Sequence, residues 1–143
     1  MSFKFLPDVN IWLALSSRLH SHHPQAKAWF DSLKDDESIL FCRFTQLGLL
    51  RLLTTEAVMG DETLTLKKAW HMYDSFVEKS WTEFVQEPHG LDAVFRQFTS
   101  AHSASPKTWA DAYLAAFAIE ADARLVTFDR ALAGKAPGSV LLN

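Results

Sequence analysis

The feature that most constrains the fold of this chain is a pair of short apolar runs, each followed closely by an aspartate. Residues 3–6 lead through Pro7 into Asp8, and residues 125–128 lead into Asp129. Apolar runs of this length predict buried strands. Between them lie segments whose apolar residues recur at helical spacing. Strands that alternate with helices predict an α/β sandwich with a mostly parallel sheet.

The rest of the sequence continues this alternation. Residues 45–57 carry leucines too densely for a single apolar stripe, which predicts a central, largely buried helix. Pro24 suits the first turn of another helix. Further helices are predicted at 10–15, 63–79, 89–99 and 106–123, and further strands at 38–42, 84–85 and 139–142.

Length and composition limit the class of protein. A chain of 143 residues without internal repeats is the size of one domain, so we expect residues 1–143 to form a single domain. The single cysteine, Cys42, excludes an intramolecular disulfide and a cysteine-rich zinc site. No run approaches the roughly 18 apolar residues of a spanning helix, and no secretory signal is evident. We therefore expect a cytoplasmic protein without a membrane segment.

The charge balance bears on nucleic-acid binding. A protein that holds nucleic acid by electrostatics alone usually has a basic excess, whereas the net charge here is -3. Any contact with nucleic acid must therefore come from a local patch, a metal ion or a partner.

Three aspartates are the candidate site. Parallel strands place Asp8 and Asp129 at the same edge of the sheet, where active sites of α/β proteins gather, and Asp111 lies near the start of a predicted helix. Carboxylates gathered in this way repel one another. A divalent cation such as Mg²⁺ or Mn²⁺ prefers oxygen ligands, relieves the repulsion and activates water against a phosphodiester.

Each aspartate also has a purely structural interpretation. Asp8 and Asp129 suit helix N-caps, because aspartate is a preferred capping residue. Asp111 suits a capping box with Thr108, unless Ser105 is the cap and Asp111 lies one turn inside the helix. Periodicity alone leaves both interpretations open.

Four sequence blocks resemble the PIN-domain family, especially bacterial VapC-type toxins. They are LPDVNIWLAL at 6–15, FTQLGLLRLLT at 44–54, WADAYLAAFA at 109–118 and LVTFD at 125–129, and together they span essentially the whole chain. The resemblance implies a three-layer α/β/α sandwich and a metal-dependent endoribonuclease that uses Mg²⁺ or Mn²⁺ to cleave RNA. It further implies a toxin with a cognate antitoxin protein and a homodimer.

The resemblance also assigns roles to individual residues. Asp8, Asp111 and Asp129 would be the catalytic, metal-binding acids, and Asn10 and Thr127 would support them. Local turn hydrogen bonding explains Asn10 and Thr127 equally well. Gln46 stands where family members commonly carry a glutamate near the start of the middle helix. Its amide oxygen can still ligate a cation, yet it adds no negative charge.

Gln46 motivates an alternative function, a PIN-fold module that binds RNA or a partner without turnover. A phosphatase of the haloacid-dehalogenase type would need a second aspartate at position 10, where this chain has Asn10.

Some further residues have competing interpretations. The cluster of His20, His22 and His23 is interpreted as a solvated turn, with a metal site as the alternative. Trp12 and Trp109 are candidates either for the core or for stacking on a base beside the cleft. The basic candidates for phosphate contacts, with surface solvation as the alternative, are Arg43, Arg51, Lys107 and Arg130.

Overall fold

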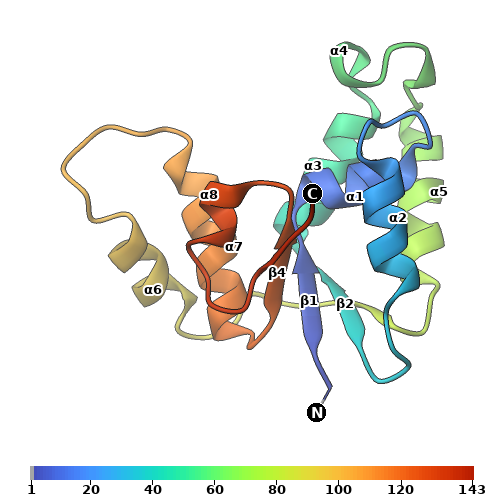
Figure 1. The fold of residues 1–143 in the computed structure, drawn as a ribbon. Coiled ribbons are helices and arrows are strands. Elements are labelled where there is room, and N and C mark those ends of the chain that lie inside the picture. The colour runs from blue at the N-terminus through green and yellow to red at the C-terminus, as the bar shows by residue number, and fades with distance from the viewer. Residues whose placement is uncertain (1) are drawn as a thin grey trace.

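A parallel sheet of five strands, in the order β3-β2-β1-β4-β5, forms the centre of the computed structural model, which describes residues 2–143 (Figure 1). Every neighbouring pair of strands is parallel, as the alternation of strands and helices predicts. The strands are β1 (Lys4–Pro7), β2 (Ser38–Phe41), β3 (Thr82–Phe84), β4 (Arg124–Thr127) and β5 (Val140–Leu141).

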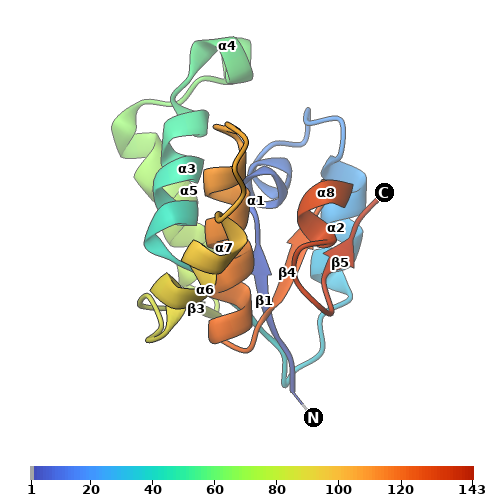
Figure 2. The ribbon, with the colours of Figure 1, turned by 90° about the vertical axis from the view of Figure 1, so that its left-hand side faces the viewer.

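Helices cover both faces of this sheet, which gives the expected three layers (Figures 1 and 2). Successive strand residues point to opposite faces. Leu6, Leu40 and Leu125 therefore pack on the side of α6 (Leu91–Phe98), α7 (Thr108–Glu120) and α8 (Arg130–Ala133). Their neighbours Ile39 and Phe41 pack on the side of α1 (Val9–Ser16), α3 (Arg43–Leu53) and α5 (Leu66–Val77).

Trp12 lies at the centre of the second of these cores. Its ring stacks on Phe41 with 3.8 Å between centroids and an interplanar angle of 14°, and it meets Phe76 edge-on at 5.0 Å. The side chain is 0% exposed. Of the two interpretations offered for Trp12, core packing is therefore confirmed.

Helix α3 differs from its prediction at both ends and in its burial. It begins at Arg43 because the Thr45 hydroxyl accepts from the Cys42 N–H at 3.1 Å, as in a capping box. It ends at Leu53, and α4 (Glu56–Met59) and the 3-10 turn Gly60–Glu62 follow separately. The prediction of a central helix was wrong, because Leu47 on α3 is 62% exposed.

The connections between strands determine which residues meet at the carboxyl edge of the sheet. In the register of β1 and β4, Pro7 lies opposite Val126, and the Asp8 N–H donates to the Val126 carbonyl at 2.9 Å. Asp8 therefore follows β1 directly beside the end of β4. Helix α2 (His23–Asp31) returns the chain toward β2. Among residues 2–143, no helix combines the length and apolar character that crossing a membrane requires.

Candidate active site

Asp8 is a buried carboxylate held by hydrogen bonds from α1 and from β4. It is the N-cap of α1, where one carboxylate oxygen accepts the Ile11 N–H at 3.1 Å. The other oxygen accepts a hydrogen bond from the Thr127 hydroxyl. Only 7% of the residue is exposed. The capping interpretation of Asp8 is thus correct, and the same bonds fix its carboxylate at the carboxyl edge of the sheet.

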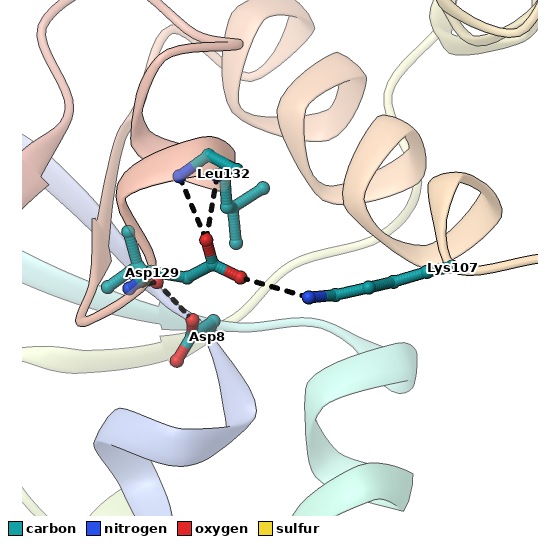
Figure 3. A network of polar contacts seen from close by, with 6 residues as sticks. Asp8, Lys107, Asp129 and Leu132 are labelled. Carbon is teal, nitrogen blue, oxygen red and sulfur yellow. Dashed lines mark hydrogen bonds and ion pairs between the residues drawn. The ribbon is translucent and has the colours of Figure 1, made fainter. Parts of the chain in front are cut away.

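Asp129 occupies the matching position after β4 (Figure 3). One carboxylate oxygen accepts the N–H groups of Ala131 at 2.9 Å and Leu132 at 3.2 Å, which caps α8. The other oxygen lies 3.7 Å from Lys107 Nζ. Each of the two aspartates therefore caps a short helix and presents its carboxylate to the same space.

Thr127 joins the two aspartates. Its hydroxyl donates to Asp8 and accepts from the Asp129 N–H at 2.9 Å, and its side chain is fully buried. A hydroxyl oxygen that accepts one bond has its proton free for another acceptor, so both of these bonds are satisfied together. The supporting role predicted for Thr127 therefore has a specific geometry: it fixes Asp8 relative to the backbone of Asp129.

Asp111 lies in the first turn of α7 and is partly exposed. The Thr108 hydroxyl pairs with Ser105 at 2.6 Å, and the N-cap of α7, Lys107, makes no side-chain capping bond among the described residues. A capping box between Thr108 and Asp111 is therefore not what holds Asp111 in place. Its charge interacts with that of Asp129.

The pKa values of Asp8 and Asp111 are raised, mainly by burial. Burial raises the pKa of Asp8, Asp129 raises it further, and hydrogen bonds from Thr127 and Ile11 lower it. Burial also raises the pKa of Asp111, again with a contribution from Asp129, while Lys107 and Lys135 lower it. Within residues 2–143, no three His, Cys, Asp or Glu side chains converge into a complete metal-holding group. Asp129 thus interacts electrostatically with both Asp8 and Asp111.

Gln46 is turned toward a different set of partners. Its amide oxygen accepts from the Arg43 guanidinium at 2.5 Å, and its side chain hydrogen-bonds Tyr73 on α5. The Arg43 guanidinium also lies 5.0 Å from the ring centre of Phe84 at the end of β3. Gln46 itself is buried, with 7% of the residue exposed. Among the described residues, no hydrogen bond links Gln46 to an acid of the site.

A cleft of about 320 Å³ opens beside Asp8 and Asp129. The rest of its lining consists of Asn10, His20, Ser21, His22 and Phe128. Asn10 is exposed in the first turn of α1, and its backbone, rather than its amide, bonds the Asp8 carboxylate. The histidines belong to the segment that sequence analysis interpreted as a solvated turn. The turn is confirmed, and within it His20 and His22 line the same cleft as the acids.

The other sequence candidates, four basic residues and Trp109, differ in what they contact. Lys107 is the basic candidate that the structure brings into contact with an acid of the site. Trp109 is 59% exposed and packs edge-on against Phe95 of α6 at 6.1 Å, away from the cleft lining. Arg43 is committed to Gln46 and Phe84. The exposed residues Arg51 and Arg130 form no ion pair among the described residues.

Comparisons with known proteins agree with this geometry. A family profile described as PIN domain matches residues 5–136. Ribonuclease VapC41 of Mycobacterium tuberculosis (strain ATCC 25618 / H37Rv) is 45% identical over 130 residues, which cover 88% of this chain and 89% of the relative. Ribonuclease VapC44 of the same strain is 33% identical over 134 residues, 90% of this chain and 87% of the relative.

Two solved structures share the fold. VapBC2 from Rickettsia felis, bound to a DNA fragment from its promoter, aligns with a TM-score of 0.71 and 14% identity over 99% of this chain and 100% of that chain. VapC20 from Mycobacterium tuberculosis, described as a toxin that cleaves the sarcin-ricin loop, aligns with a TM-score of 0.71 and 13% identity. The alignment covers 97% of this chain and 99% of that chain. At these identities the likeness concerns the arrangement of the chain alone.

Proposed function

This chain belongs to the PIN domain family, and from that premise we propose that it is a metal-dependent endoribonuclease that cleaves RNA phosphodiester bonds as the toxin of a toxin–antitoxin pair. The observation that carries the proposal is the pair of carboxylates, Asp8 and Asp129, that line one cleft, with Thr127 bonded to the Asp8 carboxylate and to the Asp129 backbone N–H. The names of the relatives, both ribonucleases, support the reaction class.

The donor set suits a hard divalent cation. It consists of carboxylate oxygens, which Mg²⁺ and Mn²⁺ prefer to nitrogen or sulfur. Mg²⁺ is usually held by one or two carboxylates, with waters and substrate phosphates completing its octahedron. A site built on Asp8 and Asp129, with Asp111 as a further acid, meets that requirement without a closed protein cage. Burial is the main cause of the raised pKa values of Asp8 and Asp111, and the charge of Asp129 adds to both; a bound cation would relieve this repulsion.

Each residue then has a defined task in phosphodiester cleavage. Asp8 and Asp129 would hold the ion, with Asp111 beside them. The bound ion would supply an activated water and neutralise charge on the phosphate. Thr127 and the backbone donors of α1 and α8 keep the two carboxylates from turning away. Lys107, 3.7 Å from Asp129, is flexible and exposed enough to move to a phosphate oxygen of the RNA.

The proposal is tested by RNA cleavage with Mg²⁺ or Mn²⁺, with and without EDTA. Asp8→Asn should abolish cleavage, whereas Asp61→Asn, an exposed acid in the 3-10 turn, should leave it unchanged. Cleavage that persists in EDTA and in Asp8→Asn would contradict a metal-dependent mechanism that uses Asp8.

We further propose a cognate antitoxin partner, a homodimer and a cytoplasmic location. Complexes described as VapBC among the structures that share this fold support the antitoxin. A small open reading frame for a DNA-binding protein beside the gene would be its source. Co-purification of the two proteins, with inhibition of RNA cleavage, is the expected result, and sedimentation of the isolated chain measures the dimer.

The alternative is a PIN-fold module that binds RNA or a partner without turnover. It rests on the missing carboxylate at Gln46. The bonds of Gln46 to Arg43 and Tyr73 weaken that support, because a glutamate in the same position would face Arg43 rather than Asp8. New cleavage activity in Gln46→Glu, with an inactive wild type, would favour the alternative. An active wild type would exclude it.

A further inference from the structure

The cleft beside Asp8 has a second wall, made by the loop that joins α1 to α2. We call residues 17–22 the histidine loop. His20 and His22 of this loop line the cleft together with Phe128, which stands between Thr127 and Asp129 in the chain. Asp8 and Asp129, the proposed metal ligands, form one side of this cleft, and the histidine loop forms the other.

The histidines fix the loop through their own hydrogen bonds. His23 Nδ1 lies 2.7 Å from the Ala14 carbonyl, which can only accept, so this nitrogen carries a proton. The His22 backbone N–H donates to His20 Nδ1 at 3.0 Å. A backbone N–H can only donate, so His20 Nδ1 accepts this bond and carries no proton. His20 therefore carries its proton on Nε2 and offers a neutral N–H donor.

His22 contributes a ring rather than a bond. Its imidazole lies 4.5 Å from the ring centre of Phe128 at an interplanar angle of 37°. This pair places two aromatic rings directly beside Asp129. Aromatic side chains beside a cleft are the surfaces on which nucleic-acid bases stack, whatever their sequence.

We propose that the histidine loop binds an unpaired ribonucleotide next to the cleaved bond. The His20 Nε2–H donates to an RNA oxygen, and the ring pair of His22 and Phe128 stacks on the base. Neutral contacts suit this place, because an added lysine or arginine would pair with the acids as Lys107 does with Asp129 and would compete with the cation. The inference rests on the proposed ribonuclease function and identifies which part of the RNA the site holds.

Steady-state cleavage of randomised single-stranded RNA oligonucleotides in Mn²⁺ tests the proposal. His22→Ala should raise KM about tenfold, within the range for losing a base-stacking side chain, with kcat little changed. His20→Ala should raise KM about fivefold, as expected for one hydrogen bond. His22→Phe keeps a ring against Phe128 and should restore KM. His71→Ala, an exposed histidine on α5, is the matched control and should change nothing.

A second measurement separates this inference from the proposed function. In an Asp8→Asn background, fluorescence anisotropy of the same RNA reports binding without turnover, and adding His22→Ala should weaken Kd about tenfold. Thermal unfolding of each variant reports the folding of the loop. A lower Tm with unchanged KM and Kd would overturn the inference and leave the loop a structural feature. A wild type that binds RNA through His22 and does not cleave it would overturn the proposed function alone.

Discussion

The carboxyl edge of the sheet carries two polar clusters with opposite charge balance. In the half around β1 and β4, the charge of Asp129 acts on both Asp8 and Asp111, and Lys107 forms the single ion pair with these acids among the described residues. In the half next to β2, Gln46 is as buried as Asp8, but its side chain hydrogen-bonds Arg43 and Tyr73.

The difference shows which polar residues are structural and which are free to bind. A buried polar group that is bonded within the protein stabilises the fold and has less capacity left for a ligand. The pKa values of Asp8 and Asp111 are raised by burial and, to a lesser degree, by Asp129, and groups with perturbed pKa values gather at functional sites. We therefore expect the proposed metal in the acidic half and structural support from Gln46.

The largest expected effect comes from neutralising Asp8. Asp8→Asn removes a proposed metal ligand and should lower RNA cleavage by at least about 100-fold, more than the loss of a supporting residue. The amide keeps an oxygen for the Ile11 N–H and no longer buries a charge. The metal-free variant should therefore have a Tm at least as high as the wild type. Retained cleavage with a lowered Tm would reverse the assignment, making Asp8 a cap alone.

Thr127 tests whether the link between the acids matters. Thr127→Val keeps the volume but removes the bonds to Asp8 and from the Asp129 N–H, and Mn²⁺ affinity should fall about 10- to 100-fold, as for other residues that orient metal ligands. Thr127→Ser keeps the hydroxyl and is the control. Equal Mn²⁺ affinities in calorimetric titrations of the two variants would show that the carboxylates need no such support.

Gln46 should affect stability and spare activity. Gln46→Ala removes the hydrogen bonds of Gln46 to Arg43 and Tyr73, so the free energy of unfolding should fall by about 0.5–1.5 kcal/mol, the net worth of an intramolecular hydrogen bond. Urea denaturation measures it, with Gln97→Ala, an exposed glutamine on α6, as the control. Cleavage per folded molecule should match the wild type. A stable variant with lost cleavage would place Gln46 in the active site.

The pH dependence of stability should be the smallest of these effects. Burial raises the pKa of Asp8 above the 3.8 of a free aspartate, so the folded state keeps a proton there that the unfolded state has lost. Stability from this residue is therefore lost as pH rises from 3.8 through the folded pKa. In EDTA, Asp8→Asn should match the wild type at low pH and exceed it in stability at neutral pH. A difference that does not grow with pH would contradict the raised pKa.

The sequence predicted where Asp8 and Asp129 lie because their positions depend on local rules; their role as metal ligands stays a prediction. A short apolar strand ending at an aspartate needs only the parallel arrangement to bring Asp8 beside the end of β4. Four blocks in family order then add Asp111, although nothing local distinguishes a metal ligand from a residue inside a helix.

The direction of Gln46 and the place of the histidine loop depend on tertiary detail. The capping bond of Thr45 sets where α3 begins and hence which way Gln46 points. Gly48 lets α3 approach α1 so closely that an added Cβ would lie 2.6 Å from a methyl carbon of Val9. His20 reaches the acids because the chain turns back after the short helix α1, and no period in the sequence encodes that return.

The central claim is that the acidic half binds the cation and the Gln46 half does not. Mn²⁺ titrations followed by electron paramagnetic resonance test it directly in Asp129→Asn and Gln46→Ala. We expect Asp129→Asn to lose Mn²⁺ binding, while Gln46→Ala, measured where it remains folded, binds as the wild type does. Mn²⁺ binding that survives Asp129→Asn and disappears in Gln46→Ala would contradict it.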